Sequence, residues 1–269
     1  MKLLNGTELV GYIKERQAKQ VRALRQARGV FPKLVILITG DDPASVTYTR
    51  LKQVYGVDIL VNVVIERTTV DVIRIRIDEL NDDNSVHGIV VQLPLTHPDQ
   101  TDDIVAHIAP EKDVDGLGPQ AGYVSATVTA IDWLLAGYNV KLEGSHIAVV
   151  GKGRLVGAPL IAEWTKAGLD VRAYDDTTSD LPTALKEADI IVTATGVPGL
   201  IRASMVGLGA VIVDAGTASE GGVLVGDVAS EVRERSDITI TPEKGGVGPL
   251  TVASLIDNVI QAAQATAKP

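Results

Sequence analysis

The sequence predicts an α/β protein of two domains with parallel sheets, the second of them a Rossmann-type dinucleotide-binding domain. Short apolar runs alternate with helical patterns along most of the chain, which is typical of parallel strands joined by crossover helices. A glycine-rich turn follows one of these strands near the middle of the chain. The length of 269 residues suits one large or two modest domains.

The composition indicates a globular protein with a substantial core. Hydrophobic residues make up 45% of the chain, and the net charge of −9 repels nucleic acid and anionic membranes. The absence of cysteine excludes disulfides, thiolate nucleophiles and cysteine-ligated metals. The N-terminus has no apolar signal segment, and no run reaches the roughly 18 apolar residues of a membrane-spanning helix. We therefore expect a cytoplasmic protein without nucleic-acid or membrane partners.

The N-terminal half reads as three helices that alternate with three strands. Asn5 or Thr7 can cap a first helix within residues 1–30. Asp42 is the candidate N-cap and Pro43 the first residue of a second helix, which is expected to end near Gly56. The other elements are expected as strands at 33–39, 59–66 and 86–95 and a helix at 70–83.

The C-terminal half begins after a loop-like segment rich in glycine, proline and aspartate, around 110–130. A helix is expected near 127–137. Strands are expected from 146 and at 169–176, 188–196, 210–216 and 237–242. The last helix, at 251–267, could return to either domain.

The glycine-rich turn opens the second domain. A predicted strand runs into Gly151-x-Gly153-x-x-x-Gly157, and a helix follows. Glycines permit the tight turn and a close phosphate approach, and the helix N-terminus offers free N–H groups. Dinucleotide binding is favoured over a plain strand-to-helix turn. The expected cofactor-binding residues are Gly151, Lys152, Gly153, Arg154, Val156, Gly157, Asp175, Asp176, Thr195 and Gly196.

Two acidic residues, Asp175 and Asp176, end the next predicted strand. A carboxylate there can accept hydrogen bonds from the adenosine ribose, which favours NAD over NADP. A solvated acidic turn is the alternative. Lys152 argues the other way, because it could pair with a 2′-phosphate.

Tyr48 and Lys52 lie four residues apart and would share one face of a helix. This spacing alone fits a solvated lysine beside a core tyrosine as well as a phenol and an amine in a site. Gln92 ends a strand after an apolar run, where packing explains it poorly. The carboxyl ends of parallel strands are where such sheets bind ligands.

Several motifs occur in a familiar order: "GDDPASVTYTRLK", "VHGIVVQLPL", "EKDVDGL", "GRLVGAP", "LVGDV" and "GGVGPLT". Together they resemble the methylenetetrahydrofolate dehydrogenase/methenyltetrahydrofolate cyclohydrolase family over roughly residues 2–265. The resemblance implies a catalytic domain of residues 1–122 plus 251–269 and a Rossmann domain of residues 123–250. It also implies folate in a cleft between the domains and a homodimer packed through the Rossmann domain.

The resemblance implies two activities on tetrahydrofolate species. The first oxidises 5,10-methylenetetrahydrofolate with NAD or NADP, and the second hydrolyses the methenyl product to 10-formyltetrahydrofolate. Lys52 would handle protons, Gln92 would hold Lys52, and Tyr48 would orient the substrate. Asp115 would accept hydrogen bonds from the pterin, with Asp113 as the alternative. The other expected substrate-binding residues are Val91, Leu93, Gly245, Gly246, Pro249 and Thr251, and Thr251 can also cap the last helix. No metal site is expected.

The chain departs from the family pattern at several places. Residues 125–130 read Ser-Ala-Thr-Val-Thr-Ala where the family has P-C-T-P-x-G, so the wall of the cleft differs. Gly151-Lys152-Gly153 replaces G-R-S, and Asp175-Asp176 replaces His-Ser. These two changes weaken a 2′-phosphate site and favour NAD. "EK" replaces a proline before Gly245, and the stretch between Lys52 and Gln92 is slightly shorter.

Two other functions fit parts of the pattern. A two-domain dehydrogenase of shikimate type also has a catalytic domain before a Rossmann unit and uses a lysine. A dinucleotide-binding or folate-binding module without catalysis is the second alternative, suggested by the altered 125–130 segment.

Overall fold

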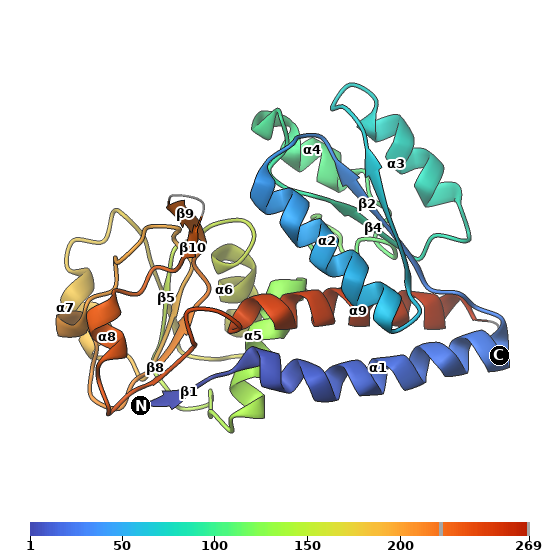
Figure 1. Ribbon diagram of the computed structural model, residues 1–269. Helices are drawn as coiled ribbons and strands as arrows, with labels where there is room; N and C mark the ends of the chain where they lie inside the picture. The colour runs from blue at the N-terminus through green and yellow to red at the C-terminus, as the bar shows by residue number, and fades with distance from the viewer. Residues whose placement is uncertain (221–222, 268–269) are drawn as a thin grey trace. The chain divides into compact units, whose positions relative to one another are not determined.

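The computed structural model describes residues 1–220 and 223–267 (Figure 1). The contacts divide the chain into two units. Unit 1 comprises Met1–Val10 and Thr127–Thr251, and unit 2 comprises Gly11–Ala126 and the chain from Val252 onward. Helices α1 (Gly6–Arg28) and α9 (Val247–Thr266) each run across a unit boundary. Residues 268 and 269, which the sequence analysis assigned to the catalytic domain, lie outside the described residues.

Unit 2 is built on a three-stranded parallel sheet in the order β3-β2-β4. All side chains from Leu34 to Ile38 on the central strand are buried, because helices cover both faces of the sheet. The core on one face joins β2 and β4 to α3 and α4, and α2 crosses the near side in Figure 1. The elements are β2 (Lys33–Ile38), α2 (Pro43–Asp58), β3 (Asn62–Arg67), α3 (Ile73–Asp82), β4 (Gly88–Val91), the 3₁₀ turn η1 (Pro98–Gln100) and α4 (Thr101–Ala106).

The start of α2 was predicted correctly and its end was not. Asp42 caps the helix by accepting a hydrogen bond from the Ser45 N–H at 2.8 Å, and Pro43 follows the cap. The helix passes through Gly56 and ends at Asp58. A Cβ on Gly56 would overlap the side chain of Val63, so glycine is needed there for the approach of β3. Leu60 takes the left-handed conformation that usually marks a terminating glycine, with φ of 67°.

Unit 1 is built on a six-stranded sheet in the order β1-β11-β8-β7-β5-β6, with parallel pairing throughout. Its elements are β1 (Lys2–Leu3), α5 (Ala126–Gly137), β5 (Ile147–Val150), α6 (Gly157–Lys166), β6 (Val171–Tyr174), α7 (Leu181–Lys186), β7 (Ile190–Thr193), the 3₁₀ turn η2 (Ala203–Met205), β8 (Val211–Asp214), β9 (Ala218–Glu220), β10 (Val223–Val225), α8 (Ser230–Arg233) and β11 (Thr239–Ile240). The order reverses at β5, which has β6 on one side and β7 on the other. Such a switch point is where open parallel sheets bind nucleotides.

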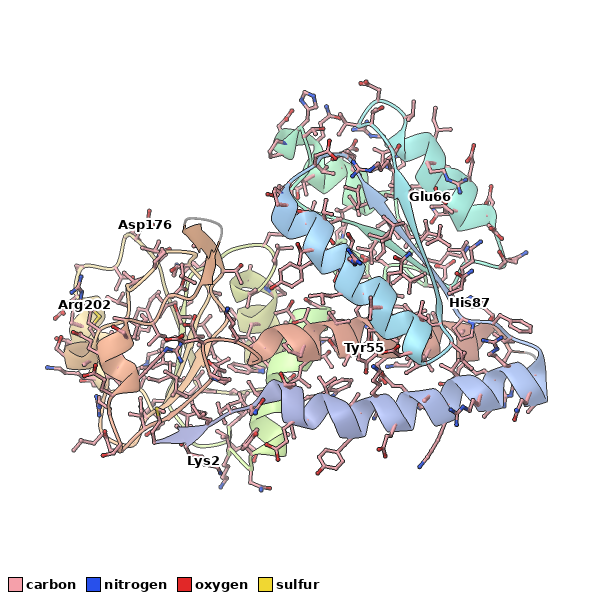
Figure 2. All side chains as sticks on the ribbon, in the orientation of Figure 1. Lys2, Tyr55, Glu66, His87, Asp176 and Arg202 are labelled. Atoms are coloured by element: carbon pink, nitrogen blue, oxygen red, sulfur yellow. The ribbon has the colours of Figure 1, made fainter. Side chains whose placement is uncertain are left out.

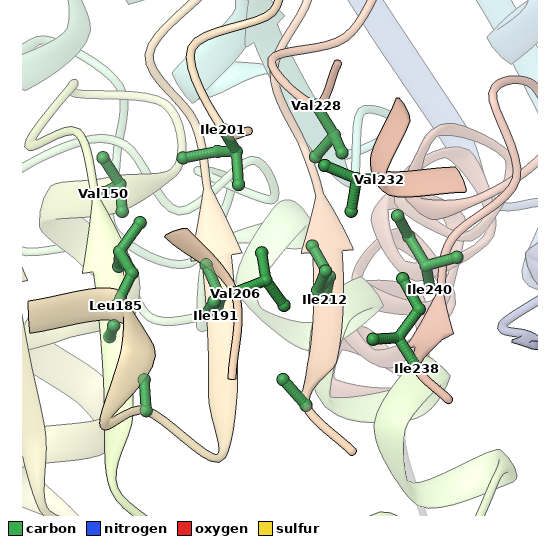
Figure 3. Packing of buried hydrophobic residues seen from close by; sticks show 13 residues of the cluster. Val150, Leu185, Ile191, Ile201, Val206, Ile212, Val228, Val232, Ile238 and Ile240 are labelled. Carbon is green, nitrogen blue, oxygen red and sulfur yellow. The ribbon is translucent and has the colours of Figure 1, made fainter. Parts of the chain in front are cut away.

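The core of unit 1 confirms the α/β reading (Figure 3). Val150, Ile191, Ile212 and Ile240 come from four neighbouring strands and form one buried layer. Leu185 of α7 and Val232 of α8 pack on this layer, among others. In β5 and β7 the residues between them are buried as well, which explains why short continuous apolar runs predicted these strands.

The N-terminal residues belong to unit 1 because β1 pairs with β11. The first helix therefore begins only at Gly6, and Asn5 accepts a hydrogen bond from the Glu8 N–H at 3.4 Å. Strand β1 was not expected from the sequence, since two residues are too few for a periodic pattern. Among the described residues, no helix is long and apolar enough to cross a membrane.

Candidate active site

Lys52 lies on the buried face of α2. Its side chain follows Ser45 and Thr49 along that face, and the residue is only 7% exposed. Tyr48, one turn earlier, is half-buried. The solvated-lysine interpretation of the sequence is therefore wrong for Lys52.

Gln92 holds the Lys52 amine. Lys52 Nζ donates to Gln92 Oε1 at 3.0 Å, and Gln92 Nε2 donates to the Leu93 carbonyl at 3.0 Å. The second bond fixes the orientation of the amide, so its oxygen faces the lysine. Ser45 Oγ also lies 3.2 Å from the Leu93 carbonyl, joining the first turn of α2 to the end of β4. Ser45 was not among the predicted site residues, although it shares the helical spacing of Tyr48 and Lys52.

Burial lowers the pKa of Lys52 below its ordinary value of 10.5, and the nearby charge of Asp115 opposes the shift. Burial has this effect because the charged ammonium loses its hydration. Burial also raises the pKa of Tyr48, so the phenol stays protonated. The site therefore offers an amine that can accept a proton beside a neutral phenol.

Asp113 braces the loop that carries Asp115. Its buried carboxylate accepts hydrogen bonds from the N–H groups of Gly116 at 3.1 Å and Gly118 at 2.7 Å. Burial raises the pKa of Asp113, and these backbone bonds oppose the rise. Asp115 is half-buried, and its side chain makes no hydrogen bond within the described residues. Of the two acids, Asp115 is thus the one whose carboxylate is available to a ligand.

Two further side chains anchor the same loop and helix. Lys112 Nζ donates to three carbonyls at the end of α3, those of Leu80, Asn81 and Asp83, at 2.7–2.9 Å. At the other end of α2, the Tyr55 hydroxyl donates to Gln17 Oε1 at 2.7 Å (Figure 2). The sequence offered no signal for either contact, because both partners are distant along the chain.

The glycine-rich turn has the geometry of a phosphate-binding loop. Gly151 has φ of +98°, and a Cβ there would lie 2.5 Å from the Ala194 carbonyl oxygen. Gly157 packs on the Gly151 carbonyl at the start of α6. Around Gly153, in contrast, the described residues leave the space open. The turn therefore fits a dinucleotide phosphate, which would approach the backbone at Gly153.

Gly153→Ala is expected to separate folding from dinucleotide binding. The added methyl meets none of the described residues within 4 Å, so the unfolding temperature of the free protein should stay within about 2 °C. The same methyl would meet an approaching phosphate, and NAD(P) affinity measured by calorimetry should fall at least about tenfold. Gly157→Ala is the contrast, since its methyl would overlap the Gly151 carbonyl and lower stability itself. Unchanged affinity in Gly153→Ala would remove this turn from the cofactor site.

Asp175 holds Lys152 at the end of β6. Asp175 Oδ2 lies 2.7 Å from Lys152 Nζ, and Oδ1 accepts from the Thr177 hydroxyl at 2.6 Å. Hydrogen bonding to Lys152 and Thr177 lowers the pKa of Asp175 to about 2. Asp176 is exposed, as Figure 2 shows, and makes no such contact. The two neighbouring acids are therefore not equivalent.

The "GGVGPLT" segment differs from the sequence prediction. Helix α9 already begins at Val247, so the Thr251 hydroxyl donates to the Val247 carbonyl at 3.3 Å and is not an N-cap. Gly245 accepts a hydrogen bond from the Thr7 N–H at 3.0 Å. Gly246 packs closely against Gly6. Packing within unit 1 thus explains both glycines, and Pro249 lies in the first turns of α9.

Other predicted residues lie as follows. Val91 is buried at the end of β4, and Leu93 is partly buried beside the unit 2 core. Of the altered 125–130 segment, Ser125 precedes α5 and the other residues form its start, and the Ser254 hydroxyl donates to the Ala126 carbonyl. Arg154, Val156, Thr195 and Gly196 lie in the loops at the carboxyl ends of β5 and β7. Among the described residues, no cluster of three or more histidine and acidic side chains could hold a metal ion.

Family models match both parts of the chain. Residues 4–115 match the tetrahydrofolate dehydrogenase/cyclohydrolase catalytic domain. Residues 125–267 match the NAD(P)-binding domain of the same family.

Full-length relatives agree with the family models. The "Bifunctional protein FolD" of Francisella philomiragia is 40% identical, over 98% of this chain and 99% of the relative. The solved bifunctional FolD of Campylobacter jejuni superposes with a TM-score of 0.91 at 35% identity, covering 98% and 99% of the two chains. The Trypanosoma brucei enzyme, solved with NADP cofactor and inhibitor, gives a TM-score of 0.91 at 30% identity, covering 99% and 98%. The chain therefore belongs to the tetrahydrofolate dehydrogenase/cyclohydrolase family, as the motifs predicted.

Proposed function

We propose that the chain performs both reactions of its family with Lys52 as the proton-handling group. It oxidises 5,10-methylenetetrahydrofolate with NAD(P), and it hydrolyses the 5,10-methenyl product to 10-formyltetrahydrofolate. The observation that carries the proposal is the buried Lys52 amine, held by Gln92 and lowered in pKa. The shikimate-type alternative is wrong, because the family models cover most of the chain.

In the oxidation, the chain's own residues bind and orient. A bound NAD(P) supplies the hydride acceptor, and the glycine turn with the β7 loop would hold it. Asp115 would accept hydrogen bonds from N–H groups of the pterin, since its carboxylate makes no hydrogen bond within the described residues. Tyr48 would pack on the substrate and keep its hydroxyl protonated. Orientation of this kind supplies much of the rate.

In the hydrolysis, the neutral Lys52 amine would take a proton from the water that attacks the methenyl carbon. A carbon–oxygen bond forms, and the cation is neutralised. The carbon–N5 bond then breaks as protonated Lys52 returns its proton to N5. The remaining hydroxyl proton leaves to solvent as the carbonyl forms, which leaves the formyl group on N10 and releases one proton overall. Gln92 Oε1 accepts a hydrogen bond from either protonation state of Lys52, so it keeps the amine in place throughout.

The test is an assay of the purified protein with methylenetetrahydrofolate, NAD⁺ and NADP⁺, and of methenyltetrahydrofolate alone. We expect turnover in both. Tight binding of folate and dinucleotide without turnover in either assay would instead support a non-catalytic binding module.

The pH dependence of hydrolysis should report the Lys52 amine. Turnover should rise with pH as Lys52 loses its proton, with a midpoint below 10.5 because burial lowers this pKa. Asp115→Asn removes the charge that opposes the shift, so the midpoint should move to lower pH. Gln92→Glu, which adds a charge beside the amine, should move the midpoint to higher pH. If the midpoint moves in neither variant, the rise of turnover with pH reports the titration of another group.

We also propose that the enzyme prefers NAD⁺ to NADP⁺. The support is the ion pair between Lys152 and Asp175, which occupies the lysine that could otherwise bind a 2′-phosphate. A higher kcat/KM with NADP⁺ than with NAD⁺ would contradict this preference.

The homodimer and the cytoplasmic location stay predictions. A dimer packed through unit 1 is supported by the free edge of β6, which pairs only with β5 among the described residues.

A further inference from the structure

A cluster of buried charges lies at the carboxyl edge of the unit 1 sheet. Asp214 is the last residue of β8, Asp227 lies between β10 and α8, and Arg233 ends α8. Asp227 is fully buried, and the side chains of Asp214 and Arg233 are 4% and 14% exposed. We call these three residues the carboxylate clamp. None of them has a role in the reactions described above.

Asp227 holds the end of β7. Its Oδ2 accepts hydrogen bonds from the Thr193 hydroxyl and the Thr195 N–H, each at 2.7 Å. Ala194, between these two residues, meets Gly151 of the phosphate-binding turn so closely that no Cβ fits there. The Asp227 carboxylate thus holds the residues on either side of Ala194, and Ala194 in turn contacts the turn that would hold the dinucleotide.

Asp214 in turn holds Asp227. Asp214 Oδ1 accepts from the Asp227 N–H at 3.0 Å, and Oδ2 accepts from the Val228 N–H at 3.2 Å and Arg233 Nη2 at 3.1 Å. A Cβ on Gly216 would overlap the Asp227 carboxylate. The backbone on which Asp227 stands is therefore held by Asp214, and the carboxylate packs closely on Gly216.

This arrangement is costly for stability. Asp227 Oδ1 is buried and finds no hydrogen-bond partner among the described residues. Burial raises the pKa of Asp214, and the neighbouring Asp227 charge adds to the rise. Buried charges with unpaired oxygens generally destabilise a fold relative to apolar packing. A clamp of this kind is better explained by the geometry that it imposes than by stability.

We propose that Asp227 is a positioning residue for the dinucleotide, fixing residues 194–196 against the Gly151 turn in the conformation that binds NAD(P). The inference rests on the proposed function only in taking NAD(P) as the ligand. Asp227 acts through the Thr195 N–H and the Thr193 hydroxyl, and needs no contact with the cofactor itself.

The test compares Asp227→Ala, Asp227→Asn and Thr193→Val. Calorimetric titration of each free protein with NAD⁺ and with NADP⁺ should show affinity at least about tenfold weaker for Asp227→Ala, which loses both hydrogen bonds. The other two variants should weaken binding less, by roughly threefold to tenfold, because Asn keeps a neutral acceptor and Val removes one donor. Dehydrogenase KM for the dinucleotide should rise more than kcat falls.

Two controls separate positioning from general damage. Asp189→Asn alters a carboxylate that accepts from the His146 N–H at 2.8 Å, beside the amino end of the same strand β7, and should leave dinucleotide affinity unchanged. Hydrolysis of methenyltetrahydrofolate needs no dinucleotide, and its Lys52, Gln92 and Asp115 lie in unit 2. The rate of this hydrolysis should stay within about twofold of wild type in all three variants, Asp227→Ala, Asp227→Asn and Thr193→Val.

Three results would overturn the proposal. They are unchanged dinucleotide affinity in the Asp227→Asn and Thr193→Val variants, equal weakening in Asp189→Asn, and a parallel loss of both activities. Should Asp227→Ala not fold, the Asn and Val variants still decide the matter. A wild-type protein without folate turnover would refute the proposed function, whereas the titrations would still test the clamp.

Discussion

Lys52→Met is expected to lower the hydrolysis of methenyltetrahydrofolate at least about 100-fold, because it removes the buried amine that we propose takes the proton from water. Stability should move in the opposite direction. Burial lowers the folded-state pKa of Lys52 below 10.5, so the lysine destabilises the fold below that pH, by an amount that grows as the pH falls to the folded-state pKa. Methionine removes this cost, and the unfolding temperature at neutral pH should rise. Both quantities can be measured on one preparation.

Lys52→Arg is the matched control for charge. Arginine keeps a cation beside Gln92 but does not give up its proton in proteins, so hydrolysis should fall as far as in the methionine variant. The stability gain should be absent, since the charge is still buried. Hydrolysis within about tenfold of wild type in either variant would show that another group handles the proton.

Asp175→Ser is expected to shift the cofactor preference toward NADP⁺. The change breaks the ion pair of 2.7 Å and frees Lys152 to approach a 2′-phosphate. It also removes a carboxylate that we expect to accept a hydrogen bond from a ribose hydroxyl. The ratio of kcat/KM with NADP⁺ to that with NAD⁺ should therefore rise at least about tenfold in steady-state assays.

Asp176→Ser and a double variant control this switch. Asp176 is exposed and makes no contact with Lys152, so its loss should change the ratio little. Adding Lys152→Ala to Asp175→Ser should cancel the gain with NADP⁺, because the freed amine is then absent. A larger shift in the ratio for Asp176→Ser than for Asp175→Ser would show that Asp176 contacts the ribose, which would contradict our interpretation.

The central strands of the two parallel sheets could be predicted because both of their faces are covered, whereas the short antiparallel pair β9–β10 was not predicted. Leu34–Ile38 of β2 are all buried, which gives a continuous apolar run that is readable without a structure. Helix ends were harder. Leu60 follows α2 in the left-handed conformation, which leucine rarely adopts and which the sequence therefore does not predict. Strand β1 is recognisable only by its pairing with β11.

The site shows the same limit in a different form. Lys52 and Gln92 are forty residues apart in the chain, so their contact followed from the family resemblance and not from spacing. The choice between Asp113 and Asp115 needed the backbone bonds to Gly116 and Gly118. Asp227 belongs to the "LVGDV" motif, but the sequence alone does not distinguish a buried aspartate from an exposed one.

Gly56 has a consequence for how this lineage can vary. Glycine inside a helix costs roughly 0.5–1 kcal/mol relative to alanine, yet a larger residue there would push β3 away from the helix that carries Lys52. Gly11 of α1 pays the same helical cost with nothing within 4 Å of an added methyl. Over evolutionary time, substitutions should accumulate freely at Gly11 and be purged at Gly56, although both are glycines in long helices.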